Sequence, residues 1–247
     1  MKSIAIIAAL ERELRPLIKH WPSTTVTHEA REFTLFEGNH AVVIISGIGP
    51  EGARAAAEAI IAQHSPDLLI SAGVAGALVP ELHVGETIFP TTVIDTQDGS
   101  RHETAIHDAP LGKTPFARTI LASYPEIASA SHKQQLAKSY GAHAVDMEAA
   151  AVARAAQVHS LPFLAIKAIS DELDFELPDM SRFIRSGQFQ TRRFLLHIAI
   201  RPWLWLRVFH LARNTRIASE NLCAWLRESV LTNTIVPGVD ARGDSTI

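Results

Sequence analysis

The stretch FLAIKAIS, residues 163–170, is an apolar run with the length of a single buried strand. Two more short runs, SIAIIAA at 3–9 and LLISA at 68–72, have the same character. Residues 50–63 and 148–158 lie between such runs and have the alanine content and spacing of helices. Strands that lack polar positions are typical of a parallel sheet covered on both faces. The sequence therefore predicts an α/β fold, a three-layer αβα domain with a central mixed, largely parallel twisted sheet.

The remaining elements extend this pattern toward both ends of the chain. Residues 33–46 predict a hairpin, and residues 183–231 predict C-terminal helices that are interrupted at Pro202. Further strands are expected at 84–94, 119–122 and 144–146, and further helices at 11–18 and 132–139. Strands and helices thus alternate over most of the chain.

The length and composition fit one domain of this class. The chain has 247 residues, 47% of them hydrophobic and 20% charged, which is sufficient for a sizeable core. We expect a single domain over residues 1–231, with a basic, Trp-bearing helical region at 180–231, and a flexible tail at 232–247. The single cysteine, Cys223, excludes an internal disulfide framework, and no run is apolar enough to span a bilayer. These features predict a cytoplasmic protein.

Two motifs resemble cofactor sites without completing one. Gly47-x-Gly49-x-x-Gly52 has the form of a dinucleotide-binding loop, but Asp67 precedes the next strand, whereas the required acid should follow it. His102 and His107 are five positions apart, although two metal ligands on one helical face need a spacing of four. We therefore expect no cofactor and no metal. The glycines are better explained by a tight turn or by close approach of the backbone to a small ligand.

Three acidic residues follow the ends of expected strands: Glu13, Glu148 and Asp171. Ligands of open α/β sheets bind at the carboxyl ends of the strands, so these side chains are candidates for one active site. Each also has an ordinary structural explanation. Glu13 fits a solvated first helical turn, Glu148 fits a helix start favoured by the helix dipole, and Asp171 fits a helix N-cap. Pattern alone leaves the function open.

Six short motifs occur in an order that resembles one enzyme family. They are Ala9-Leu10-Glu11-Arg12-Glu13-Leu14, Ser46-Gly47-Ile48-Gly49, Ser71-Ala72-Gly73-Val74-Ala75-Gly76, Val84-Gly85-Glu86, Val145-Asp146-Met147-Glu148-Ala149 and Ala168-Ile169-Ser170-Asp171. Together they resemble the superfamily of purine nucleoside phosphorylases and methylthioadenosine/S-adenosylhomocysteine (MTA/SAH) nucleosidases, over about residues 2–177. The resemblance implies the nucleoside phosphorylase/hydrolase fold and cleavage of the N-glycosidic bond of a purine nucleoside.

The resemblance also implies a role for each acid. Asp171, positioned by Ser170, would protonate or hydrogen-bond N7 of the purine, which needs a partly protonated carboxyl group that burial would favour. Glu148 would hold the ribose hydroxyls, with Met147 packed against the sugar. Glu13 would orient and deprotonate the attacking water. The further positions expected to bind the substrate are Ile48, Ala72, Gly73, Tyr124 and Ile127.

Water is the expected nucleophile rather than phosphate. By resemblance, family phosphorylases have an arginine and a serine where this chain has Ser71 and Val74. The carboxylate of Glu13 would also repel an anion. Arg12 or Arg15 is an alternative source of a phosphate site. Outside the enzymes, the alternative is a non-catalytic nucleoside-binding relative, although a binding protein needs no acid at N7.

The C-terminal region is strongly basic. Residues 180–219 hold eight arginines and no acidic residue, although the net charge of the whole chain is −3. Arginines alternate with apolar and aromatic residues over 192–216. This pattern indicates either a packed helix with a solvated basic face or a helix that lies at a membrane surface. One such region on an otherwise acidic chain does not predict a nucleic-acid partner.

The same region resembles a narrower group within the superfamily. Arg201-Pro202, Leu206 and Leu211-Ala212-Arg213 resemble the tail of hopanoid-associated phosphorylases. That resemblance implies removal of adenine from adenosylhopane, with an MTA/SAH nucleosidase and a phosphate-dependent purine nucleoside phosphorylase as alternatives. It also implies peripheral contact with the inner face of the membrane through residues 192–216. The partner expected in every case is a small purine nucleoside, bound by a homo-oligomer.

Overall fold

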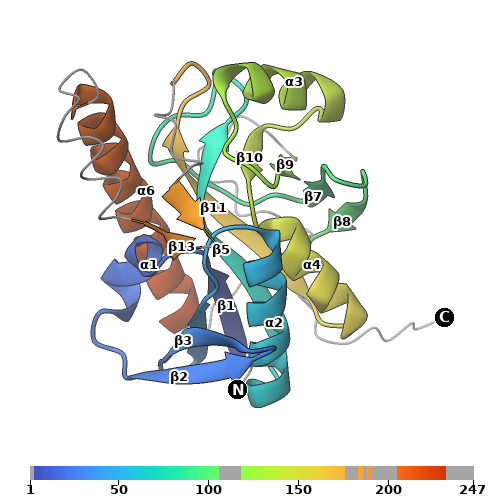
Figure 1. Cartoon of the computed structure of the whole chain (residues 1–247), viewed down its shortest axis with the longest axis vertical. Coiled ribbons are helices and arrows are strands. Elements are labelled where there is room, and N and C mark those ends of the chain that lie inside the picture. Colours follow the sequence, from blue (N-terminus) through green and yellow to red (C-terminus); the bar gives the residue numbers. More distant parts are fainter. Residues whose placement is uncertain (1–2, 106–117, 176–182, 186–187, 191–204, 232–247) are drawn as a thin grey trace.

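The computed structural model describes residues 3–105, 118–175, 183–185, 188–190 and 205–231 (Figure 1). Its helices are α1 (Glu11–Ile18), α2 (Pro50–His64), α3 (Ala130–Tyr140), α4 (Ala149–Val158) and α6 (Trp205–Leu231). Its strands are β1 (Ile4–Ala8), β2 (Ser23–His28), β3 (Arg31–Glu37), β4 (Ala41–Ile45), β5 (Leu68–Ala77), β6 (Thr87–Ile88), β7 (Thr92–Asp95), β8 (Arg101–Glu103), β9 (Ile120–Ser123), β10 (Ala144–Asp146), β11 (Phe163–Asp171), β12 (Ile184–Arg185) and β13 (Gln188–Phe189).

Eleven of these strands form one mixed sheet in the order β2-β3-β4-β1-β5-β10-β9-β7-β8, with β11 paired to β5 and β6 paired to β11. Strand β1 runs parallel to β4 and β5, and β11 runs parallel to β5. The end of β5 pairs antiparallel with β10. Strand β5 is therefore joined to β1, β10 and β11, the three strands that precede or contain the candidate acids. This sheet confirms the predicted fold class.

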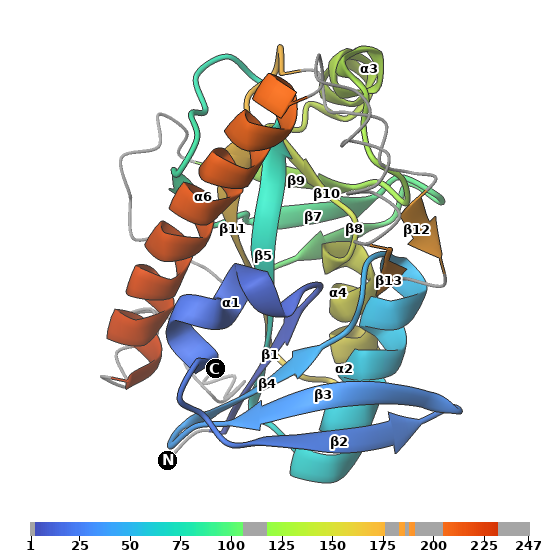
Figure 2. The same cartoon turned by 60° about the vertical axis from the view of Figure 1, so that its left-hand side comes forward.

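Helices lie on both sides of the sheet (Figure 2), and an apolar core lies on each face of it. Helices α2 and α4 cover one face through their alanine-rich surfaces, and α1 and α6 cover the other with leucines. Successive residues of β11 point alternately to the two faces. Ala165 and Ile169 enter the first core, whereas Ile166 and Ala168 enter the second. The chain thus forms the predicted helix–sheet–helix arrangement.

Two of the expected strands have different bounds. The strand expected over 84–94 is divided into β6 and β7, and Pro90 lies between them. Proline has no N–H to donate to a neighbouring strand, so it interrupts the pairing. The strand expected to end before Gly73 continues to Ala77. Gly73 and Gly76 therefore lie within the strand, where the absence of a side chain lets Glu13 and Asp171 approach the backbone.

The pattern also missed three pieces of sheet. Residues 184–185 and 188–189, expected to be helical, form the antiparallel pair β12–β13. Strand β2 is a largely exposed edge strand, so its polar sequence lacks the apolar pattern that predicts a strand. Strand β8 lies between the expected strands at 84–94 and 119–122, where no strand was predicted. Pro202 and the expected tail at 232–247 lie outside the described residues.

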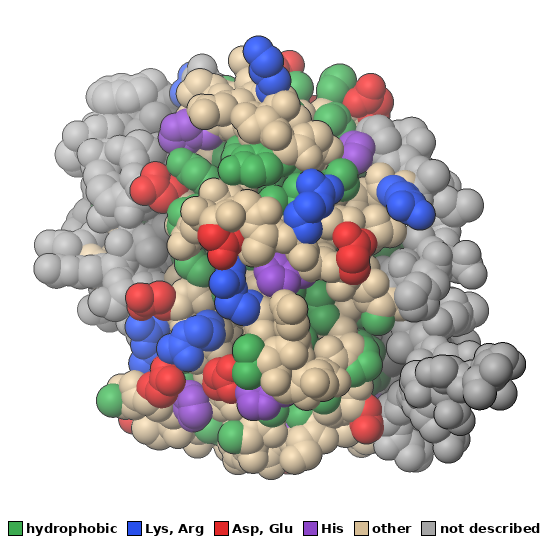
Figure 3. Space-filling model, turned by 90° about the vertical axis from the view of Figure 1, so that its right-hand side faces the viewer, with side chains coloured by type: hydrophobic (Ala, Val, Ile, Leu, Met, Phe, Trp, Pro, Cys, Tyr) green, Lys and Arg blue, Asp and Glu red, His purple; other side chains and the backbone are tan. Residues whose placement is uncertain are grey.

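Acidic and basic side chains are intermingled on the face that Figure 3 shows, which includes α2 and α4. Arg54 of α2 pairs with Glu29, and Arg154 of α4 pairs with both Asp95 and Asp98. Pairs of this kind divide the charge of the surface into small areas of both signs. Within the described part of the chain, no helix is long and apolar enough to cross a membrane.

Candidate active site

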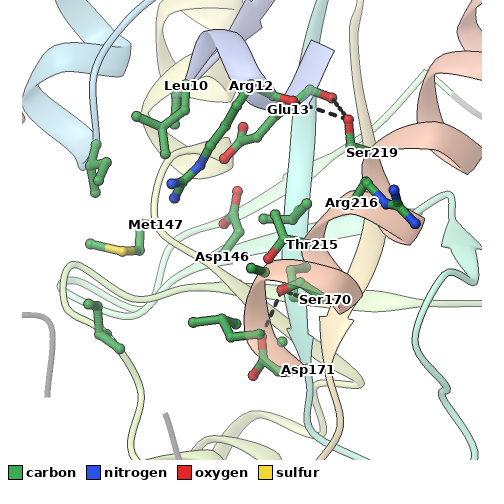
Figure 4. Close-up of a pocket in the computed structure, with 18 of the residues that line it drawn as sticks. Leu10, Arg12, Glu13, Asp146, Met147, Ser170, Asp171, Thr215, Arg216 and Ser219 are labelled. Atoms are coloured by element: carbon green, nitrogen blue, oxygen red, sulfur yellow. Dashed lines mark hydrogen bonds between the residues drawn. The ribbon is translucent and has the colours of Figure 1, made fainter. Parts of the chain in front are cut away.

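A pocket of about 750 Å³ lies at the carboxyl ends of β1, β5, β10 and β11, between helices α1 and α6 (Figure 4). Its lining includes all three acids that the sequence singles out, namely Glu13, Glu148 and Asp171. The volume falls in the range of roughly 300–1,000 Å³ that is usual for sites of small molecules. The three strand ends that the sequence suggested therefore do meet in one cavity.

Glu13 is buried although it belongs to the first turn of α1. Gly73 of β5 makes room for it, because a Cβ atom at that position would lie only 2.8 Å from Glu13 Oε2. Burial raises the pKa of Glu13 to about 7, against the opposing effects of Lys167 and Arg12. A carboxyl group with this pKa can exchange a proton near neutral pH. The solvated helix residue that pattern alone allowed is therefore wrong for Glu13.

Glu148 precedes α4 and lies half-buried in the pocket wall. The backbone N–H of Gly49 donates a hydrogen bond to Glu148 Oε1 at 2.8 Å. Gly49 has a φ of +98°, which glycine adopts without strain, and a Cβ atom at Gly52 would lie 2.5 Å from the carbonyl oxygen of Ser46. The motif that resembled a dinucleotide loop thus turns the backbone toward Glu148. Burial raises the pKa of Glu148, and the Asp146 carboxylate raises it further.

Asp171 ends β11 where the register against β5 shifts, between Ile169 and Asp171. A bulge of this kind redirects the side chains beside it. Ser170 Oγ donates to Asp171 Oδ1 at 2.7 Å, and Lys133 Nζ donates to Asp171 Oδ2 at 2.5 Å. Gly76 of β5 leaves space for this pair, because a Cβ atom there would lie 2.8 Å from Oδ2. Asp171 thus accepts one hydrogen bond from a hydroxyl group and one from a buried ammonium group.

Two buried groups of the site were not predicted, Lys167 and Asp146. Lys167 is 2% exposed, and its Nζ lies 2.9 Å from Asp146 Oδ2 and 2.9 Å from Ser71 Oγ. Burial lowers the pKa of Lys167, but the carboxylates of Asp146 and Glu148 outweigh burial and hold it above the usual value. One cation is thereby shared among the carboxylates on this side of the pocket. The sequence did carry a signal, since Lys167 is the single charged residue within the apolar stretch 163–170.

Asp146 is held from several directions. Its Oδ1 accepts a hydrogen bond of 2.5 Å from Ser123 Oγ, and its Oδ2 accepts one of 2.9 Å from the backbone N–H of Ala149. Ala149 is the first residue of α4, so the carboxylate stabilises the positive end of that helix. These contacts fix the turn that carries Met147 and Glu148.

The other predicted substrate-binding residues divide into two groups. Met147, Ser170, Ile48 and Ile127 line the pocket together with the acids. Ala72, Gly73 and Tyr124 are not among the lining residues. Ala72 is buried in the core beneath α1 and α6, Gly73 adjoins Glu13, and the Tyr124 ring packs edge-on against His132, with centroids 5.6 Å apart.

Helix α6 forms a wall of the pocket, which sequence reasoning did not foresee. Val208, Leu211 and Thr215 line the cavity opposite the strand ends. Lower in α6, Ser219 Oγ donates to the carbonyl oxygens of Arg12, at 3.2 Å, and of Glu13, at 2.7 Å. Figure 4 shows these contacts beside the Glu13 side chain. The C-terminal helix thus fixes the backbone that carries the first acid.

The second cofactor-like motif has a local explanation as well. His102 lies on β8 and its Nε2 is 3.2 Å from Ser100 Oγ, while His107 lies outside the described residues. Across the residues with defined positions, no group of three His, Cys, Asp or Glu side chains could hold a metal ion.

Comparison with known proteins identifies the family. The family model described as Phosphorylase superfamily matches residues 3–193. The chain belongs to this superfamily. It is accordingly an enzyme of the nucleosidase and phosphorylase group, whose members cleave nucleosides at the N-glycosidic bond.

Individual relatives are distant. The 5′-methylthioadenosine/S-adenosylhomocysteine nucleosidase of Anoxybacillus flavithermus is 29% identical over 197 residues, which cover 68% of this chain and 85% of the relative. The nucleosidase of the same name from Neisseria meningitidis, solved with methylthio-immucillin-A, has a TM-score of 0.67 at 21% identity and covers 94% of this chain and 100% of its own. The futalosine hydrolase of Helicobacter pylori has a TM-score of 0.65 at 18% identity, with coverage of 92% and 98%. These structures confirm the nucleoside phosphorylase/hydrolase fold.

Proposed function

We propose that this protein hydrolyses the N-glycosidic bond of an adenine nucleoside. The observation that carries the proposal is the convergence of Glu13, Glu148 and Asp171 on one pocket from segments far apart in the chain. Departure of the base leaves a ribose with oxocarbenium character, so carboxylates around the sugar and a proton donor at the base both lower the barrier. The pocket offers both kinds of group.

Each acid has a distinct place in the proposed reaction. Asp171, which accepts a hydrogen bond from Ser170, protonates or hydrogen-bonds N7 of the base. Glu148, oriented by the Gly49 N–H, accepts hydrogen bonds from the ribose hydroxyls, and Met147 packs against the sugar. Glu13, with its pKa raised to about 7, removes a proton from the attacking water.

Water is favoured over phosphate by the charge around the nucleophile position. Glu13 and Asp146 both line the pocket, and the Asp146 charge acts on Glu13 by raising its pKa. A phosphate dianion beside these carboxyl groups would be repelled. Val74, which also lines the pocket, offers no hydrogen bond to an anion. Arg12 and Arg15 line the α1 side of the pocket, so phosphorolysis is the alternative that the assay must test.

The group attached at the 5′ position is set by the space between α1 and α6. The relatives named above support a methylthio or homocysteinyl group. A second candidate, adenosylhopane, is favoured by a specific observation. Apolar residues of α6, including Val208 and Leu211, line the pocket, and the first turns of the same helix carry exposed Trp205 (54%), Leu206 (72%) and Phe209 (65%). An apolar substituent would lie along this wall.

The same exposed side chains support peripheral contact of α6 with a membrane. Arg207 and Arg213 are exposed beside Trp205, Leu206 and Phe209, and cations next to apolar side chains suit an anionic lipid surface. Residues 192–204 of the region expected to make this contact lie outside the described residues. The absence of a nucleic-acid partner and the homo-oligomer remain predictions.

The test is a substrate panel. Methylthioadenosine, S-adenosylhomocysteine, adenosine, inosine and an adenosylated hopanoid are incubated with the protein, with and without phosphate, and free base is quantified. Phosphate-independent release of adenine is expected, and the preferred substrate reveals the 5′ group. Release that requires phosphate would show a phosphorylase. Absence of release from every substrate would refute the proposal and indicate a nucleoside-binding relative.

A further inference from the structure

Lys133 is a buried cation next to Asp171, the acid expected to act on N7 of the purine. It lies on α3, is 1% exposed, and lines the pocket together with Asp171. Its Nζ donates to Asp171 Oδ2 at 2.5 Å and to the carbonyl oxygen of Glu172 at 2.7 Å. Burying an ammonium group is costly unless it is paired and hydrogen-bonded, and these two acceptors satisfy that requirement.

The pairing creates a problem for the expected chemistry. Both oxygens of the Asp171 carboxyl group already accept a hydrogen bond, one from Lys133 and one from Ser170. Adenine, however, leaves more readily when N7 receives a proton during cleavage of the C1′–N9 bond. Two donors lie at hydrogen-bond distance from Asp171, Lys133 Nζ and Ser170 Oγ. The ammonium group is the stronger acid of the two, so it is the better source of that proton.

We propose that Lys133 supplies the proton that Asp171 passes to the base, an inference that rests on the proposed nucleosidase activity. One Lys133 N–H bond breaks and a proton joins Asp171 Oδ2. Asp171 then gives a proton to N7 as the C1′–N9 bond breaks and its electrons move to the base. Water adds to C1′ and loses its proton to Glu13. The neutral lysine amine regains a proton from solvent, Glu13 releases one, and the enzyme returns to its starting state.

A purely structural ion pair is the rival explanation, and arginine distinguishes the two. Arginine keeps the positive charge beside Asp171 but does not give up its proton in proteins. Lys133→Arg therefore preserves a counterion while removing the proton source. Lys133→Met removes both and keeps a similar volume. Lys138→Met is the matched control, because Lys138 is exposed on the same helix and does not line the pocket.

The experiment compares two substrates for each variant. One is the best adenine nucleoside from the panel above, and the other is 4-nitrophenyl riboside, whose nitrophenolate leaves without a proton. We expect Lys133→Arg and Lys133→Met to lose about 100-fold or more of kcat on the adenine substrate, the usual contribution of general acid catalysis, yet stay within about threefold of wild type on the nitrophenyl substrate. Lys138→Met should match wild type on both.

Two results would overturn the inference. Wild-type turnover of the adenine substrate by Lys133→Arg would show that charge alone suffices, and equal losses on both substrates would show a structural role. Adenine affinity and Tm of each variant show whether its site is intact. If wild type does not cleave the nitrophenyl substrate, an Arg variant with intact adenine binding and lost turnover supports the inference. If wild type releases no base from any nucleoside, the proposed function itself fails.

Discussion

Replacing Glu13 by Gln should separate catalysis from stability, because the native structure holds this carboxyl group where it resists ionisation. Burial raises its pKa from 4.5 to about 7. Between these two pH values the folded protein binds more protons at this position than the unfolded chain, so stability falls as pH rises through the interval. At 1.36 kcal/mol for each pH unit, the destabilisation above pH 7 is about 3 kcal/mol.

The amide of Glu13→Gln never ionises, so the variant avoids this destabilisation. At pH 4 its stability should equal that of wild type. At pH 8.5 it should be more stable by up to about 3 kcal/mol, or roughly 6–12 °C in Tm for a chain of this size. Lys167 keeps its ion pair with Asp146 at 2.9 Å, so the change leaves no buried cation without a partner. Base release should fall about 10²–10⁴-fold, as expected for loss of a general base.

The assay is thermal unfolding of both proteins at half-unit steps from pH 4 to 9. Glu11→Gln serves as the control, since Glu11 is exposed in the same helical turn. Its Tm should follow wild type closely over the whole range. Two results would refute burial as the cause of the raised pKa of Glu13. One is a Tm difference between Glu13→Gln and wild type that does not change with pH, and the other is a variant less stable than wild type at pH 8.5.

Three further results are expected. The kcat/KM of base release should fall tenfold for each pH unit below about 7, because Glu13 must lose its proton to act; a flat profile down to pH 5 would exclude it as the base. Gly76→Ala should lower turnover at least tenfold, because its Cβ would lie 2.8 Å from Asp171 Oδ2; unchanged turnover would contradict this packing. Replacing Leu206 and Phe209 by Ser should reduce co-sedimentation with anionic vesicles but not cleavage of methylthioadenosine, and unaltered sedimentation would argue against membrane contact.

The sequence predicted the central features of this fold because its core strands are apolar on both faces. Residues 3–9 and 163–170 show this pattern, and the ends of these two strands and of the strand at 144–146 located the three acids. Strand β2 was missed because an exposed edge strand needs no apolar pattern. Residues 84–94 were predicted as one strand from their apolar residues. Pro90 divides them into β6 and β7, because it cannot donate a hydrogen bond to a neighbouring strand.

The candidate site was predictable only in part. The motifs placed Glu13, Glu148 and Asp171 at the pocket, but spacing along a chain does not reveal which cations face them. Lys167 stands out in an apolar strand, whereas Lys133 lies in a helix with polar neighbours and gave no signal. Its contact with Asp171 spans 38 positions and depends on how α3 packs against β11. The pairing of Asp171 with a buried cation could not be predicted for this reason.

The bond between Ser219 and the backbone of Glu13 has a consequence for synthesis of the protein. It joins positions 206 residues apart, so the N-terminal acid leaves the ribosome long before the helix that fixes it. At about 5–20 residues per second, the interval is on the order of 10–40 s. During that time the nascent chain has its first strands but not the α6 wall of its pocket. The pocket is thus complete only once translation has passed α6.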